Sequence, residues 1–126
     1  MNVQDWTVIV VEDTYDDIEL ASTILRHYGI KVETANNGKE CLKLLKHVQP
    51  TLIITDLSMP HMDGWEMLQQ IRTNGLTQHI PVVAVTAYDS LDVAHDAVGA
   101  GFDAYVPKPL SPRNLIEQLQ QILQSD

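Results

Sequence analysis

Residues 52–60 read Leu-Ile-Ile-Thr-Asp-Leu-Ser-Met-Pro, a short apolar run that stops abruptly at Asp56. The run is too short and too rich in β-branched residues for a helix, and Pro50 and Pro60 bound it, so we expect a buried strand. Asp56 would then stand at the carboxyl end of that strand. In an open α/β sheet this edge binds ligands, because loops and helix starts converge there. Since aspartate is also a common turn residue, the rest of the chain must distinguish a functional role from a local one.

Strand-like and helical stretches alternate along the whole chain. Apolar, β-branched runs predict five strands, at residues 6–11, 31–34, 52–56, 81–87 and 103–106. Apolar residues at helical spacing predict five helices, with N-caps at Thr14, Asn37, Asp63, Asp89 and Ser111. This alternation predicts an α/β fold: a doubly wound domain with a parallel sheet, covered on both faces through right-handed crossovers.

The predicted helices differ in how much apolar surface they offer. The apolar stripe of the second helix is expected to reach Val48, and the third helix is expected to end near Thr73. The fourth helix, from Asp89 to Val98, has an apolar side made mostly of alanine, which offers little area to bury. We expect it to be the most weakly held helix.

Composition limits the class of protein. With 126 residues the chain has the size of one domain, taken as residues 1–126. It has no long apolar span and no basic, apolar leader, so a cytoplasmic location is expected. A single cysteine, Cys41, excludes an internal disulfide and a site of several thiolates. The net charge of -9, from 17 acidic and 8 basic residues, argues against direct nucleic-acid binding.

Residues with carboxylate, hydroxyl or ammonium groups stand at the carboxyl ends of four of the predicted strands. They are Glu12 and Asp13, Asp56, Thr86 and Lys108. Carboxylates held within a few ångströms repel by about 4 kcal/mol per pair at an effective dielectric of roughly 20, so the cluster predicts a bound cation. Oxygen donors alone favour a hard ion such as Mg²⁺.

A metal, a lysine and a hydroxyl at one point are suited to phosphoryl transfer, where positioning and charge neutralisation provide most of the catalysis. Asp56 is expected at the centre of the sheet with Asp13 and Lys108 on either side, and a carboxylate is a competent nucleophile. We therefore predict Asp56 as the phosphoryl acceptor. Each of these residues alone would also fit a structural role, and the prediction rests on their combination.

Four stretches carry a resemblance to a known family. They are Val-Val-Glu-Asp at residues 10–13, Thr-Asp-Leu-Ser-Met-Pro at 55–60 followed by Asp63-Gly64, Val-Thr-Ala at 85–87, and Tyr-Val-Pro-Lys-Pro at 105–109. In this combination, which spans essentially the whole chain, the sequence resembles the receiver domain of two-component response regulators. The resemblance implies a flavodoxin-like fold with strand order 2-1-3-4-5. It also implies that Asp56 receives a phosphoryl group from a phosphohistidine of a histidine kinase or a histidine phosphotransfer protein.

The resemblance further implies a metal site. Asp13 and Asp56 would ligate Mg²⁺ directly, the backbone carbonyl of Ser58 would complete the protein ligands, and Glu12 would act mostly through a metal-bound water. Asp16 and Asp17, by contrast, are interpreted as acids of a first helical turn that interact with the helix dipole, and not as ligands.

The same resemblance assigns the switching residues. Lys108 would contact the phosphoryl oxygens, and its peptide bond to Pro109 is expected to be cis. Thr86 would move toward the phosphoryl group, and Tyr105 would change rotamer behind it. Ala87 is small and would leave the site accessible.

The resemblance implies a phosphoacceptor switch and not an enzyme. The switch would change the binding of a downstream protein target through the face of the fourth helix, fifth strand and fifth helix. One alternative is a receiver fold that scaffolds a partner without phosphorylation. A haloacid-dehalogenase-type phosphatase is less favoured because Ser58 stands where that family has a second aspartate. A nucleotide-binding enzyme is also less favoured, because this chain has no glycine-rich turn after its first predicted strand. Met1 and the lack of a linker favour a stand-alone regulator of chemotaxis or phosphorelay type over the alternative, a domain cut from a longer regulator or hybrid kinase.

Overall fold

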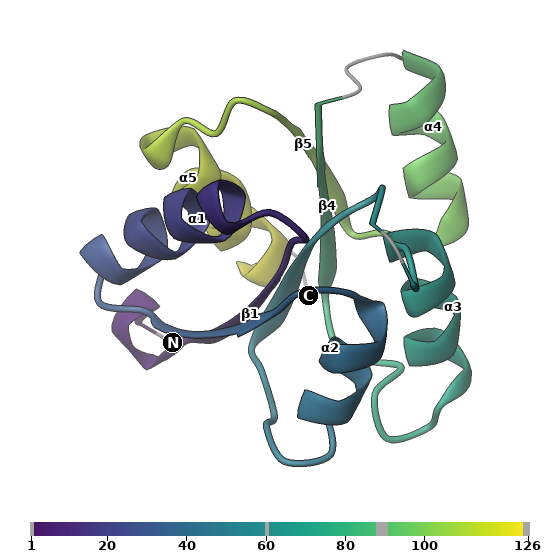
Figure 1. Ribbon diagram of the computed structural model, residues 1–126. Helices are drawn as coiled ribbons and strands as arrows, with labels where there is room; N and C mark the ends of the chain where they lie inside the picture. The colour runs from purple at the N-terminus through teal and green to yellow at the C-terminus, as the bar shows by residue number, and fades with distance from the viewer. Residues whose placement is uncertain (1, 60, 88–90, 125–126) are drawn as a thin grey trace.

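The computed structural model describes residues 2–59, 61–87 and 91–124. Its five parallel strands lie in the order β2-β1-β3-β4-β5, with bounds β1 Thr7–Val11, β2 Lys31–Ala35, β3 Leu52–Asp56, β4 Val82–Thr86 and β5 Ala104–Pro107. A 3-10 turn, η1 (Val3–Asp5), precedes the helices α1 Tyr15–His27, α2 Gly38–Leu44, α3 Gly64–Thr73, α4 Leu91–Ala100 and α5 Pro112–Gln124. Helices α1 and α5 cover one face of the sheet, and α2, α3 and α4 cover the other (Figure 1). The predicted flavodoxin-like, doubly wound fold is confirmed.

Alternation of side chains along the central strands explains this three-layer packing. In β1, Val8 and Val10 belong to the apolar cluster with α1 and α5, whereas Ile9 and Val11 belong to the cluster with α2 and α3. Successive residues of a strand point to opposite faces, so a strand covered on both sides must be apolar throughout. This is why the central strands read as continuous apolar runs and not as alternating patterns.

Polar caps begin the helices where the sequence predicted them. The Thr14 hydroxyl accepts a hydrogen bond from the Asp17 amide at 3.4 Å, and Asn37 Oδ1 accepts from the Glu40 amide at 3.0 Å. Asp63 Oδ1 accepts from the Glu66 amide at 2.9 Å, which fixes the start of α3 directly after the β3 loop. Helix α5 begins at Pro112, directly after the predicted cap at position 111. The predicted cap at Asp89 lies outside the described residues.

Helix α2 is shorter than its apolar stripe predicted. It ends at Leu44, and the chain then tightens into turns in which the Lys46 amide donates to Lys43 O at 3.2 Å and the His47 amide to Leu44 O at 2.9 Å. The stripe therefore continues to Val48, which packs against the core, without a continuing α-helix. Apolar spacing reports which side chains face the core but does not by itself distinguish a helix from successive turns.

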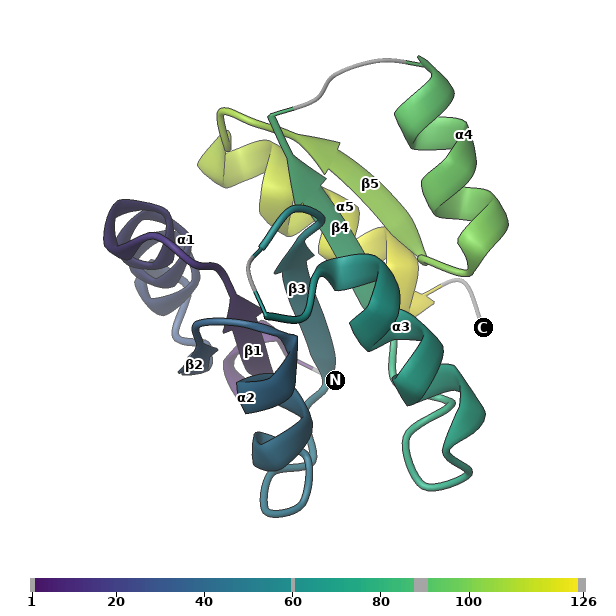
Figure 2. The same cartoon turned by 45° about the vertical axis from the view of Figure 1, so that its right-hand side comes forward.

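Helix α4 is the least buried of the long helices in the described part of the chain. Of its described side chains only Ala97 is buried, and Val98 is 63% exposed. In contrast, α1 and α3 each bury four residues. Figure 2 shows α4 at the outer end of its layer, beside β5. The expectation of a weakly held fourth helix fits this packing, because burial of apolar area is what holds a helix to a sheet.

Candidate functional site

The carboxyl ends of the strands meet at the edge where the strand order reverses, between β1 and β3. Glu12 follows β1, and Asp56 is the last residue of β3. Strand register places Thr86 and Lys108 beside them. Asp56 lies opposite Val85, so Thr86 on β4 stands one residue beyond the Asp56–Val85 pair. Lys108 follows β5, and its amide donates to Thr86 O at 2.9 Å. The parallel register therefore gathers residues that are far apart in the sequence.

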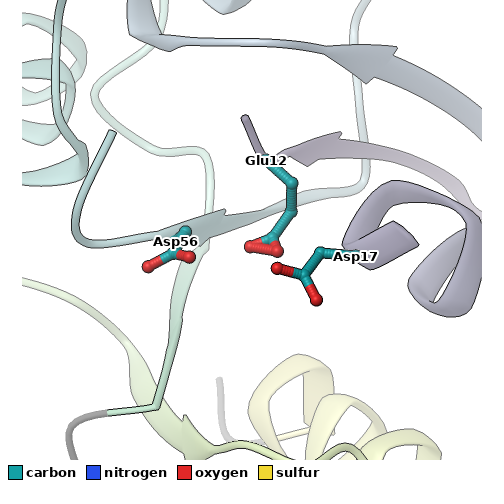
Figure 3. A group of neighbouring side chains, drawn as sticks. All are labelled: Glu12, Asp17 and Asp56. Carbon is teal, nitrogen blue, oxygen red and sulfur yellow. The ribbon is translucent and has the colours of Figure 1, made fainter. Parts of the chain in front are cut away.

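Lys108 forms the centre of this cluster. Its Nζ lies 3.0 Å from Glu12 Oε2, 3.0 Å from Asp56 Oδ2 and 3.1 Å from Asp17 Oδ2. Figure 3 shows the three carboxylates, which reach the site from the end of β1, the end of β3 and the first turn of α1. Carboxylate oxygens of these three residues all lie within 4.8 Å of one another. A single ammonium thus faces more negative charge than it can balance.

Burial strengthens the effect of this excess of negative charge. Glu12 is only 4% exposed, and burial raises its pKa to about 8 even though Lys108 lowers it. Burial by itself lowers the pKa of Lys108, but its hydrogen bonds to Glu12, Asp56 and Asp17 raise that pKa above the usual value. Lys108 therefore keeps its charge at neutral pH. The site favours positive charge.

Asp17 corrects the interpretation drawn from the sequence. The sequence favours Asp17 as an acid of the first helical turn that interacts with the helix dipole over a metal ligand, and in the structure its carboxylate also contacts Lys108. A hydrogen bond with Thr14 and, beyond it, the Lys108 ammonium lower the pKa of Asp17, so it is ionised. The available signal was its place in the first turn of a helix that begins at the β1 edge, because the N-terminus of that helix must lie near the site.

The other predicted metal ligands take different places. Asp13 is exposed and lies outside the group of three carboxylates found among the described residues. Ser58 is exposed in the loop after β3, and its amide donates to Asp56 Oδ1 at 3.1 Å. Both oxygens of Asp56 are therefore held, one by Lys108 and one by the loop. The structure brings Glu12, Asp56 and Lys108 into contact and leaves the Asp13 side chain in solvent.

The predicted switching residues lie around this cluster. Thr86 is buried at 1% exposure, whereas Ala87, the next residue, is exposed. Tyr105 is half-buried and packs against the core cluster on the α4 side of the sheet. The Lys108-Pro109 peptide bond is cis.

The residues present fit a hard divalent cation. The donor atoms are carboxylate oxygens, and the Glu12 Oε1 atom is buried with no hydrogen-bond partner in the described part of the chain. A buried carboxylate oxygen without a partner is costly, and a cation or its bound water would satisfy it. The cluster is therefore an acidic, oxygen-only site suited to a metal ion.

Comparison with known proteins identifies the class of protein to which the sequence resemblance points. The model of the response regulator receiver domain matches residues 8–120. An uncharacterized 14.6 kDa protein from the sodA1 3' region of Leptolyngbya boryana is 36% identical, over 90% of this chain and 87% of that protein. Response regulator MprA of Mycolicibacterium vanbaalenii is 32% identical over 92% of this chain, which spans only 49% of MprA. The chemotaxis response regulator CheY4 of Vibrio cholerae has a TM-score of 0.85 and 27% identity, covering 93% of this chain and 98% of that chain.

The fold and the acidic site at its switch point define a doubly wound α/β domain with a carboxylate cluster suited to a metal ion. The chain belongs to the response regulator receiver domain family, and it is a receiver domain of two-component signal transduction. No helix in the described ranges combines the length and the apolar character needed to cross a bilayer.

Proposed function

We propose that Asp56 accepts a phosphoryl group from a phosphohistidine of a histidine kinase or a histidine phosphotransfer protein, with Mg²⁺ at the acidic cluster. The observation that carries this proposal is the contact of Lys108 Nζ with Asp56 Oδ2 at 3.0 Å, beside the buried carboxylate of Glu12. This arrangement places a nucleophile, a fixed positive charge and a cation site at one point.

Among the three clustered carboxylates, Asp56 is the best acceptor. Glu12 is buried, and burial raises its pKa, so its carboxylate is the least reachable of the three. Asp17 lies on a helix at the margin of the site. Asp56 ends the central strand, retains a 13% exposed side chain, and is oriented by Lys108 and the Ser58 amide. It is therefore both reachable and held in place.

In the transfer step a carboxylate oxygen of Asp56 forms a bond to phosphorus while the bond from phosphorus to the donor imidazole nitrogen breaks. The electron pair of the broken bond stays on that nitrogen, and because the other ring nitrogen of the phosphohistidine carries a proton, the donor leaves as a neutral imidazole. The product is an acyl phosphate on Asp56. When bound, Mg²⁺ supplies positive charge that offsets the charge on the phosphoryl oxygens.

The residues of this chain hold the components and respond to the product. Asp56, Asp13 and the Ser58 carbonyl would hold Mg²⁺, with Glu12 through a bound water. Lys108 would donate a hydrogen bond to a phosphoryl oxygen, and the Thr86 hydroxyl would move toward the phosphoryl group. The Lys108 amide donates a hydrogen bond to Thr86 O, so the backbones that carry these two side chains are linked.

The phosphoryl group carries about two negative charges, and because Asp56 loses its own carboxylate charge in the acyl phosphate, the site gains about one negative charge and three acceptor oxygens. The Thr86 hydroxyl and the Lys108 ammonium would move toward these oxygens. Movement of Thr86 on β4 would leave space for Tyr105 on β5, and α4 above them is thinly packed. We propose that the α4-β5-α5 face thereby changes its affinity for a downstream protein. On this proposal residues 1–126 act as one domain in the cytoplasm, as a switch that assists its own phosphorylation without being an enzyme.

The test is intact mass after incubation with acetyl phosphate and Mg²⁺, with Asp56→Asn as a matched variant and a chelator as a second control. We expect the parent to gain one phosphoryl group and the variant and the chelated sample to gain none. A folded parent that takes no group from acetyl phosphate or from a phosphohistidine donor would contradict the proposal and favour a phosphorylation-independent scaffold. Sustained release of phosphate from esters would favour the phosphatase alternative.

A further inference from the structure

Asp17 contacts Lys108 in the cluster although it is not among the expected metal ligands. Its Oδ2 lies 3.1 Å from Lys108 Nζ, compared with 3.0 Å for the carboxylates of Glu12 and Asp56. The side chain is 37% exposed, compared with 5% for Glu12 and 13% for Asp56. Asp17 therefore sits at the solvent side of Lys108 and holds it from α1.

We propose that Asp17 is a positioning residue that acts through Lys108: it holds the ammonium in the resting state and competes with the phosphoryl group for it. This inference deepens the proposed function and rests on it. When a phosphoryl group arrives on Asp56, Lys108 must give up part of its contact with Asp17 to donate to the new oxygens. Asp17 thus lowers the affinity of the site for the phosphoryl group.

The same carboxylate has the opposite effect on a cation. Its oxygen lies within 4.8 Å of oxygens of Glu12 and Asp56, so its negative charge attracts a divalent ion to the cluster. Loss of that charge should weaken cation binding while it strengthens the binding of an anion beside Lys108. Two effects of opposite sign distinguish this role from loss of a helix-stabilising residue, which would disturb both ligands in the same direction.

The neighbouring residue Asp16 is a matched control. It is an exposed acid in the same first turn of α1, and its replacement removes the same charge from the helix N-terminus. Any effect through the helix dipole is shared by the two positions. A difference between Asp17→Asn and Asp16→Asn therefore reports the contact with Lys108.

The experiment compares the parent, Asp17→Asn, Asp16→Asn and Asp17→Glu. Magnesium affinity is measured by calorimetry. The affinity for beryllofluoride, whose beryllium becomes tetrahedral when an aspartate oxygen binds it and so resembles a phosphoryl group, is measured by fluorine NMR at saturating Mg²⁺. For Asp17→Asn we expect about a two- to fivefold loss of Mg²⁺ affinity and about a two- to fivefold gain in beryllofluoride affinity, a scale set by partly exposed ion pairs. Asp16→Asn should match the parent, and Asp17→Glu, which keeps the charge, should lie near it.

The outcomes separate this inference from the function on which it rests. A parent that binds no beryllofluoride would overturn the proposed function and this inference together. A parent that binds it normally, with Asp17→Asn and Asp16→Asn indistinguishable, would overturn the role of Asp17 alone. Weaker binding of both ligands by Asp17→Asn would also overturn it, because that pattern indicates structural damage.

Discussion

Gly64 lies directly against the backbone of Asp56. A Cβ at position 64 would stand 2.5 Å from the Asp56 carbonyl oxygen and 3.2 Å from Leu57 Cα. The Gly64 amide also donates to Leu57 O at 3.2 Å. Helix α3 therefore starts in contact with the loop that orients the proposed acceptor, and only glycine allows this approach.

Replacement of Gly64 by alanine should disturb both stability and phosphorylation. Because the nearest atoms belong to the backbone, the loop itself must shift, and overpacking of this kind costs about 1–3 kcal/mol. We expect Gly64→Ala to lower the free energy of unfolding in urea by that amount and to slow loading from acetyl phosphate.

Gly99 provides the control for this substitution. A Cβ at that exposed position of α4 would meet no described atom within 4 Å, so Gly99→Ala should stabilise the protein by about 0.5–1 kcal/mol through helix propensity. Equal behaviour of the two variants would contradict the close approach at Gly64.

Removal of the Lys108 ammonium should slow phosphorylation of Asp56 strongly. Lys108→Gln deletes the ammonium that contacts all three clustered carboxylates. A preorganised charge of this kind is worth about a hundredfold or more in rate, and we expect at least that loss in the rate of mass gain with acetyl phosphate. Arg113→Gln removes the same charge from a side chain that is 86% exposed and should leave the rate unchanged. A Lys108→Gln rate within twofold of the parent rate would argue against the role of Lys108.

Helix α4 should be the first long helix to lose protection in hydrogen exchange. Since Ala97 is its only buried side chain in the described range, local opening of α4 exposes little apolar surface and costs little free energy. We expect its amides to exchange faster than those of α3 in the resting protein and to change rate when beryllofluoride is bound. Protection that equals that of α3 and does not respond to the anion would exclude α4 as the switching element.

Cys41 should make stability depend on pH in the alkaline range. Burial raises the pKa of its thiol from 9.0 to about 12. Between these values the unfolded chain has released the thiol proton and the folded protein still holds it, so stability falls as pH rises. At pH near 10 the contribution lost is about 1 kcal/mol.

The Cys41 dependence can be isolated with Cys41→Ala. Denaturant titrations at several alkaline pH values should show the parent losing stability relative to the variant as pH rises from 8 to 10, because the other titrating groups are shared. A constant difference between the two proteins would show that the thiol ionises as readily in the fold as in the unfolded chain.

Much of the fold could be predicted because its determinants are local. Thr14, Asn37 and Asp63 cap helices through bonds to amides three residues away, and such bonds depend on little beyond their own segment. The limits of local patterns appear at α2, where apolar spacing continues to Val48 but the helix ends at Leu44.

Contacts between distant segments could not be predicted in this way. Arg72 on α3 donates to Ile80 O at 2.7 Å, to Gly101 O at 3.3 Å and to Asp103 Oδ2 at 2.9 Å. Asp103 Oδ2 also accepts from the Val82 amide at 2.8 Å. No spacing rule relates these positions, since their proximity depends on how α3 packs beside β4 and β5.

The amino-acid sequence by itself determined which chemical groups stand at the strand ends, because apolar runs locate the strands and parallel strands share one carboxyl edge. Glu12, Asp56, Thr86 and Lys108 were predictable for that reason. Only the tertiary structure decided that Asp17 shares Lys108 and that the Asp13 side chain stays exposed. Side-chain direction at the start of α1 depends on the angle at which that helix leaves the sheet, and this angle is set by packing against β1, β2 and α5 and not by any local pattern.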